Sequence, residues 1–234
     1  MSRRLVLWRH GQTEWNLAGR GQGHIDVPLD DVGRQQARAA AARLASLRPS
    51  AIISSDLSRA YETAEALADL TGLEVRRDPA LREIHLGKWQ GLTRREVNEQ
   101  FADERRRIHA GEDVRRGVDG ETVAEVAERA VAALERAAKL ADGPDGGRTV
   151  IVVAHGLSLR VGACRFLGID QRHWTAFGGL SNCAWIVLEE GQLGWRFTEW
   201  NAGTLPEPVL SGDDIESVTG DGDQDDSDGE PLAN

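Results

Sequence analysis

The chain has 234 residues, of which 40% are apolar, and its 28 Lys and Arg stand against 38 Asp and Glu, for a net charge of −10. This length is ample for a buried core, and the composition excludes a wholly disordered chain and an integral membrane protein. The acidic balance argues against a nucleic-acid partner, which needs a positively charged surface.

Short apolar strands alternate with amphipathic helices in the first half of the chain. Apolar runs predict strands at residues 3–8 and 51–54, and each is followed by a helix: one over residues 32–47, and one that ends near Gly72. Residues 11–31 are rich in glycine and predict a loop.

The second half continues this alternation. Expected elements are a third strand at 73–75, a loop over 78–92, a highly charged helix over 93–110, a helix that begins at the capping box Thr122-Val123-Ala124-Glu125 and ends before 142–147, and later strands near 183–189 and 195–200. Residues 149–154 form a continuous apolar run, typical of a central parallel strand, with a helix after it. Together these elements predict an α/β protein, a three-layer α/β/α sandwich with a mainly parallel sheet.

The acidity of the chain is concentrated at its C-terminus. Residues 201–234 contain ten Asp and Glu and no Lys or Arg, so residues 1–200 are neutral overall. From residue 203 the composition turns to Gly, Asp, Ser and Pro, which cannot bury enough apolar surface to fold. We therefore predict a folded domain over 1–204 and an acidic disordered tail over 205–234.

Two cysteines, Cys164 and Cys183, are too few for a disulfide framework. The apolar run near the N-terminus, from Leu5 to Trp8, is far shorter than a secretory signal or a membrane span. We expect a reduced, cytoplasmic protein with two buried thiols and no membrane partner.

Candidate chemical groups follow the predicted strands. Arg9 and His10 end the first strand, His155 follows the most apolar one, and Arg59 begins a helix just after the second. Open α/β sheets bind ligands at the carboxyl ends of their strands. Arginine fits phosphate geometry, and imidazole can attack phosphorus or transfer a proton. The pattern favours an anionic substrate, but a structural role for each residue explains the spacing equally well.

The segment Arg9-His10-Gly11-Gln12-Thr13-Glu14-Trp15-Asn16 resembles the signature of the histidine phosphatase superfamily, which has the phosphoglycerate-mutase-like fold. The resemblance continues in the family's order over about residues 3–200. It includes Gln22-Gly23, Asp26, Pro28-Leu29 and Gly33, then Ser54-Ser55-Asp56-Leu57-Ser58-Arg59-Ala60, Leu81-Arg82-Glu83 with Gly87 and Gly91, and Val152-Val153-Ala154-His155-Gly156.

This resemblance implies phosphoryl transfer through a phosphohistidine, with no cofactor. His10 would attack phosphorus as a neutral imidazole, and Glu83 would protonate the leaving oxygen and then activate water. The groups implied to hold the phosphate are Arg9, Arg59, His155 and the Asn16 amide, with Gln22, Gly11 and Gly156 at the same pocket. The implied partner is a small phosphorylated metabolite, and the family likeness also suggests a homodimer.

Two departures favour a phosphatase over a cofactor-dependent phosphoglycerate mutase, which stays the alternative. Mutases typically follow their acid with Arg-His-Tyr-Gly, whereas Ile84-His85-Leu86-Gly87 follows Glu83 here, and Gly21-Gln22-Gly23 replaces a Gly-Trp pair. A mutase needs extra cationic contacts to rebind its intermediate.

Several stretches look most like the glucosyl-3-phosphoglycerate phosphatase branch of actinobacteria: residues 54–61, 85–93 and 178–185. Leu157-Ser158 stands where this branch would have a second glycine. The resemblance therefore implies a phosphorylated sugar or glycerate without fixing which one.

Two features have competing interpretations. Arginines cluster at Arg94-Arg95, Arg105-Arg106-Arg107 and Arg115-Arg116, as expected either of a lid that binds a substrate carboxylate or of a solvated helix with interspersed acids. Metal-ligand spacing is lacking: no His-x-x-x-His or Cys-x-x-Cys occurs, and the Asp-rich segment at 221–232 lacks the glycine and glutamate of a calcium loop. We expect no metal site.

Overall fold

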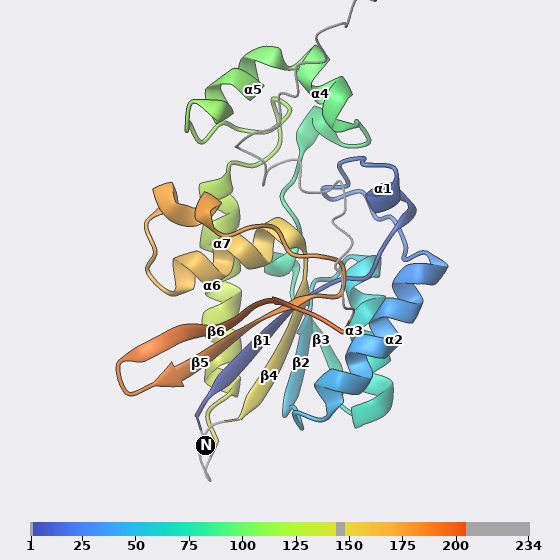
Figure 1. Cartoon of the computed structure of the whole chain (residues 1–234), viewed down its shortest axis with the longest axis vertical. Helices are drawn as coiled ribbons and strands as arrows, with labels where there is room; N and C mark the ends of the chain where they lie inside the picture. The colour runs from blue at the N-terminus through green and yellow to red at the C-terminus, as the bar shows by residue number, and fades with distance from the viewer. Residues whose placement is uncertain (1, 144–147, 205–234) are drawn as a thin grey trace, which may run out of the picture.

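The computed structural model describes residues 2–143 and 148–204, and the predicted tail at 205–234 lies outside them. Six strands form one mixed sheet in the order β3-β2-β4-β1-β5-β6 (Figure 1). They are β1 (Arg4–Arg9), β2 (Ala51–Ser54), β3 (Val75–Arg77), β4 (Thr149–Ala154), β5 (Trp185–Gly191) and β6 (Gly194–Ala202). The first four in space are parallel, β5 runs antiparallel to β1, and β6 runs antiparallel to β5. The prediction of a mainly parallel sheet is confirmed.

Helices cover both faces of the sheet. Helices α2 (Asp31–Ala45) and α3 (Ser58–Thr71) lie on one face, and α6 (Val123–Leu140) and α7 (Gly156–Phe166) lie on the other (Figure 1). Alternate strand residues point to opposite faces. In β1, therefore, Val6 and Trp8 pack with α2 and α3, whereas Leu5 and Leu7 pack with α6 and α7. The three-layer α/β/α architecture follows from this alternation.

A third apolar cluster lies beyond the carboxyl ends of the parallel strands. Trp89 and Val97 join residues from α6 and α7 in it. The short elements of this region are α4 (Arg94–Gln100), α5 (Ala102–His109), and the 3₁₀ helices η1 (Pro79–Leu81), η2 (Gly87–Trp89) and η3 (Gln171–Ala176). Helices α4 and α5 stand above the sheet in Figure 1.

Local sequence signals determine where two of the helices begin or end. Gly72 ends α3 in the left-handed conformation with φ 69°, which glycine adopts without steric cost. The predicted capping box is present at α6, where the Thr122 side chain accepts from the Glu125 N–H and the Glu125 carboxylate accepts from the Thr122 N–H.

Three local predictions need correction. The helix expected over 93–110 is two helices, because the chain turns at Phe101, whose ring packs against Trp89 with centroids 6.0 Å apart. The loop expected over 11–31 contains the short helix α1 (Glu14–Leu17), and the strand expected at 73–75 lies at Val75–Arg77.

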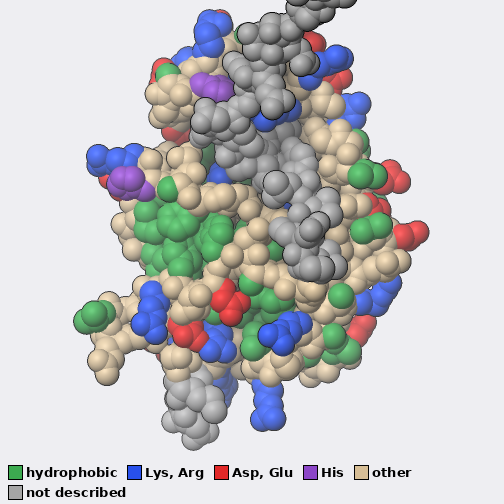
Figure 2. Space-filling model, in the orientation of Figure 1, with side chains coloured by type: hydrophobic (Ala, Val, Ile, Leu, Met, Phe, Trp, Pro, Cys, Tyr) green, Lys and Arg blue, Asp and Glu red, His purple; other side chains and the backbone are tan. Residues whose placement is uncertain are grey.

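On the face shown in Figure 2, acidic and basic side chains are interspersed. This distribution agrees with the neutral balance of residues 1–200.

Candidate active site

The two strand-end histidines lie side by side. Strands β1 and β4 are parallel neighbours, and their last paired residues are Arg9 and Ala154. The next residue of each chain segment is a histidine, so the register brings His10 and His155 together, with ring centroids 5.1 Å apart. Both side chains are buried. The structure therefore places the two predicted site histidines side by side at one sheet edge.

His10 is arranged as a neutral imidazole with a defined tautomer. Its Nδ1 lies 2.7 Å from the Gly11 carbonyl oxygen, which can only accept a hydrogen bond, so Nδ1 carries the proton and Nε2 keeps its lone pair. Burial, with the positive charges of Arg59 and Arg9, holds the pKa of His10 well below its usual range. The ring is thus ready to act as a nucleophile at neutral pH.

His155 is held from the neighbouring strand β2. Its Nε2 lies 2.9 Å from the hydroxyl of Ser55, the residue that follows β2. Burial and the charge of Arg59 lower the pKa of His155 well below the ordinary value. Ser55 was missed as a site residue, although the rule that places ligands after parallel strands applies to it as well as to His10.

The two predicted arginines are buried at the same edge. Arg59, in the first turn of α3, donates from Nη1 to the Ile25 carbonyl at 2.9 Å and from Nη2 to the Gly23 carbonyl at 2.8 Å. Arg9 donates from Nη1 to the Leu180 carbonyl. Each is about 1% exposed. Carbonyl oxygens orient a guanidinium while leaving its charge intact, which suits an anion site.

Asn16 is placed by the start of helix α1. Its Oδ1 accepts from the Thr13 N–H at 3.0 Å and from the Asn182 side chain at 3.2 Å. These bonds orient the amide, with its Oδ1 turned toward Thr13 and Asn182. Gln22 is also buried, at 3% exposure. Both residues lie inside the protein, as expected of pocket amides, and Asn182 is a further residue that sequence reasoning left out.

The two predicted glycines differ in what they permit. A Cβ on Gly11 would lie 2.5 Å from the carbonyl oxygen of Gly33, so close packing between two backbone segments requires this glycine. The Gly11 N–H also binds the Thr63 hydroxyl at 3.1 Å, which ties the His10 loop to α3. At Gly156 a Cβ would make only ordinary contact with the Arg9 side chain.

Glu83 meets the N-terminus of α7, the helix that begins just after His155. Its Oε2 accepts from the Leu157 N–H at 3.1 Å, and its Oε1 accepts from the Ser158 N–H at 3.1 Å. His155 offers no side-chain cap to this helix, so Glu83 caps α7 from more than 70 positions away in the sequence. The predicted acid and the predicted second histidine therefore share one helix start.

This geometry gathers a neutral histidine, a second histidine, two arginines and a carboxylate at one sheet edge. The residue pattern pointed to the histidines and arginines, and the family resemblance pointed to Glu83. A model of the histidine phosphatase superfamily (branch 1) matches residues 5–203. The chain belongs to the histidine phosphatase superfamily.

Several named proteins are similar to this chain over most of its length. The glucosyl-3-phosphoglycerate phosphatase of Mycolicibacterium vanbaalenii is 40% identical over 215 residues, which cover 86% of this chain and 95% of that protein. A Photorhabdus laumondii protein named "Probable phosphoglycerate mutase GpmB" is 36% identical over 84% of this chain and 89% of its own length. A solved mycobacterial glucosyl-3-phosphoglycerate phosphatase, in complex with VO3, superposes with a TM-score of 0.78 at 39% identity, covering 86% of this chain and all of that one.

The arginines of residues 94–116 divide into two groups in this histidine phosphatase. Arg106 is exposed and pairs with Asp103, and Arg107 pairs with Glu112 at 2.8 Å, as expected of solvated helices. Arg105 and Arg116 are buried, and the Arg116 guanidinium lies 5.9 Å from the centre of the Trp89 ring. The expectation of a uniformly solvated segment therefore applies only to the first group.

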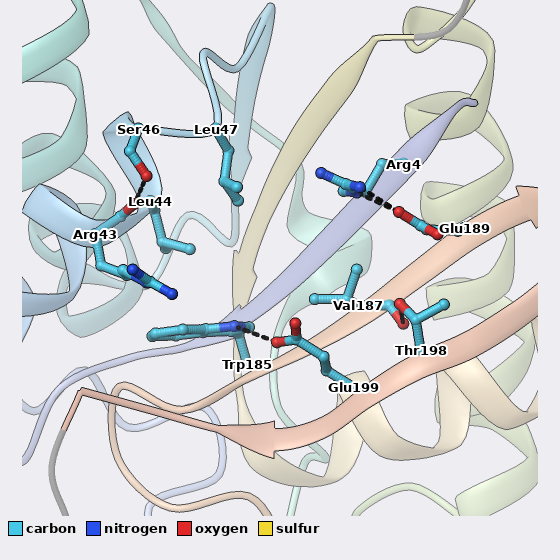
Figure 3. Close-up of a pocket in the computed structure, with 10 residues that line it drawn as sticks. All are labelled: Arg4, Arg43, Leu44, Ser46, Leu47, Trp185, Val187, Glu189, Thr198 and Glu199. Carbon is cyan, nitrogen blue, oxygen red and sulfur yellow. Dashed lines mark hydrogen bonds and ion pairs between the residues drawn. The ribbon is translucent and has the colours of Figure 1, made fainter. Parts of the chain in front are cut away.

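Within residues 2–143 and 148–204, no three His, Cys, Asp or Glu side chains are grouped to hold a metal ion, and no helix is long and apolar enough to cross a membrane. A pocket of about 330 Å³ lies between α2 and the β5–β6 hairpin (Figure 3). Two of its charged groups, Arg4 and Glu189, pair with each other, and none of the predicted site residues lines it.

Proposed function

We propose that this histidine phosphatase hydrolyses a small phosphomonoester through a phosphohistidine intermediate. One observation carries the proposal: the Nε2 lone pair of a buried, neutral His10 lies among Arg9, Arg59 and His155 at adjoining strand ends. Such a cluster attracts a phosphate dianion and places a nucleophile within it.

The reaction has two steps in this proposal. In the first, His10 Nε2 forms a bond to phosphorus as the bond to the leaving oxygen breaks, and Glu83 donates a proton to that oxygen. In the second, Glu83 takes a proton from water, the water oxygen bonds to phosphorus, and the bond to His10 breaks. Arg9, Arg59, His155 and Asn16 hold the phosphoryl oxygens during both steps.

We propose glucosyl-3-phosphoglycerate as the substrate, on two supports. The relative from M. vanbaalenii carries that name and matches over 95% of its length. The stretches at 85–93 and 178–185 also look like that branch. The alternative is a phosphoglycerate mutase, which the name of the P. laumondii relative keeps open.

The test is phosphate release from a panel of glucosyl-3-phosphoglycerate, 3-phosphoglycerate, sugar phosphates and p-nitrophenyl phosphate. We expect the highest kcat/KM with glucosyl-3-phosphoglycerate. Phosphate release from another alkyl phosphate alone would overturn the proposed substrate but would support the proposed phosphatase reaction. Formation of 2-phosphoglycerate from 3-phosphoglycerate, without free phosphate, would establish the mutase instead.

We also propose that the enzyme works in the cytoplasm as a homodimer. Both cysteines are buried and free, which suits a reducing compartment. The dimer rests on the family resemblance, and light scattering that gives a single-subunit mass would contradict it.

A further inference from the structure

Glu83 lies in a segment that lacks regular secondary structure, between η1 and η2. Its carboxylate is held by the N-terminus of α7, but its main chain needs partners from elsewhere to stay in place. Those partners come from one side chain of α6, Arg129, and from His24. Neither belongs to the predicted site.

Arg129 donates hydrogen bonds to three main-chain carbonyls within residues 80–83. Its Nη1 donates to the Ala80 carbonyl at 3.0 Å and to the Arg82 carbonyl, and its Nη2 donates to the Glu83 carbonyl at 2.8 Å. His24 Nε2 lies 2.8 Å from the same Glu83 carbonyl. Since that oxygen only accepts, His24 Nε2 donates to it.

Glu121 fixes Arg129 in turn. Its two carboxylate oxygens accept from Nε and Nη2 of Arg129, each at 2.8 Å, which is a bidentate pair. Glu121 also accepts from the His85 N–H at 2.8 Å, and the Glu121 N–H donates to the His85 carbonyl at 2.8 Å. The Glu121–Arg129 pair therefore contacts the chain on both sides of Glu83.

This pair is sheltered, with side-chain exposures of 20% for Arg129 and 21% for Glu121. Burial by itself raises the pKa of Glu121, but the hydrogen bonds and charge of Arg129 outweigh it, and the pKa lies below the usual value. The carboxylate stays ionised and bound to Arg129 at neutral pH.

We propose that Arg129 and Glu121 are positioning residues that hold Glu83 for proton transfer. The inference rests on the acid–base role given to Glu83 in the proposed function. Both ends of Glu83 are then fixed, the carboxylate by α7 and the main chain by Arg129 with His24. A misplacement of about 1 Å in a catalytic group can cost on the order of 100-fold in rate.

The test compares two leaving groups in the Arg129→Gln variant. p-Nitrophenolate departs without a proton, whereas the alkoxide of the best alkyl phosphate in the panel needs one. We expect kcat/KM for the alkyl phosphate to fall by about 10- to 100-fold, and kcat/KM for p-nitrophenyl phosphate to stay within about threefold. The Glu121→Gln variant should show the same selectivity, more weakly, because it keeps the Arg129 bonds to the main chain.

Arg136→Gln is the matched control. Arg136 lies on the same face of α6, two turns after Arg129, and pairs with Asp78 at 2.6 Å. The Arg136→Gln variant should keep the wild-type kcat/KM for both substrates. Equal losses on both substrates in Arg129→Gln, after correction for active enzyme by the p-nitrophenol burst, would show a structural role only and overturn the proposal. An unchanged kcat/KM for both substrates in Arg129→Gln would also overturn the proposal.

The Glu83→Gln variant separates this inference from the proposed function. If Glu83→Gln shows the leaving-group selectivity and Arg129→Gln does not, the positioning role is wrong and the mechanism stands. If Glu83→Gln itself shows no selectivity, the acid role of Glu83 is wrong, and the positioning role falls with it. When both are right, the double variant loses little more than Glu83→Gln alone.

Discussion

Arginines gather both at the site edge of the sheet and in the α4–α5 segment, but the arginines at the edge are held differently from the exposed arginines of the segment. At the edge, Arg9 and Arg59 are buried and donate to main-chain carbonyls. In the segment, Arg95 and Arg106 lie in solvent next to carboxylates of their own helices. A carbonyl orients a guanidinium without cancelling its charge, whereas a carboxylate cancels it. Burial against main-chain carbonyls therefore distinguishes Arg9 and Arg59 from the exposed arginines of α4 and α5.

The largest loss of activity is expected from substitution of His10, at the centre of the buried site. His10→Ala removes the only nucleophile proposed for the reaction, and kcat should fall by on the order of 10⁴ or more. The assay uses p-nitrophenyl phosphate, together with labelling of the protein by radioactive phosphate, which the variant should lose. His173→Ala, at an exposed histidine of η3, is the control. Residual turnover near wild type would overturn the phosphohistidine.

Arg59→Lys tests whether the carbonyl-held guanidinium acts through its shape as well as its charge. Lysine keeps the charge but cannot bind both the Ile25 and Gly23 carbonyls and still present a planar fork. We expect kcat to fall by about 10²–10³. Arg95→Lys, from the exposed group, should change kcat by less than about twofold. Equal effects in the two variants would remove the distinction between the two groups.

Burial of the site also predicts how stability depends on pH. The pKa values of His10 and His155 are lowered, chiefly by burial, so the folded protein stays unprotonated while the unfolded chain takes up protons near pH 6.5. The unfolded state then binds more protons. The free energy of unfolding therefore falls as the pH decreases below about 6.5, by about 1.4 kcal/mol per pH unit for each histidine.

Urea unfolding at about pH 7.5 and about pH 5.5 measures this slope. His10→Ala removes one buried imidazole, so the difference in unfolding free energy between these two pH values should be smaller than in the wild type by about 1.4 kcal/mol in total. An unchanged pH dependence would show that folding does not lower the pKa of His10, which contradicts the effect expected from its burial.

The sequence predicted the sheet and its flanking helices because strong periodic patterns and local caps encode them. Gly72 and Thr122 ended and began helices where expected. The break of the 93–110 helix at Phe101 could not be predicted, because it depends on a contact with Trp89 that no local pattern contains. Periodicity describes one helix at a time, whereas this turn is set by packing.

The site shows the same division. His10 and His155 were predictable because each directly follows a strand, and Ser55 could have been found in the same way. Arg129 and Glu121 were not predictable, since their link to Glu83 exists only once α6 packs beside residues 80–83. The residues proposed to contact the substrate lie at element ends that a sequence pattern reveals, whereas the residues proposed to support them do not.

The smallest effect on activity is expected at the exposed arginines of α4 and α5. Arg106, whose side chain is 73% exposed, pairs only with its helix neighbour Asp103 among the residues described for it. Arg106→Glu should leave KM for carboxylated substrates unchanged and stability within about 0.5 kcal/mol. Steady-state kinetics with glucosyl-3-phosphoglycerate and with p-nitrophenyl phosphate measures this. A rise in KM for the carboxylated substrate alone would place Arg106 in a lid over the site. Carboxylate pairing would then no longer separate the two groups of arginines.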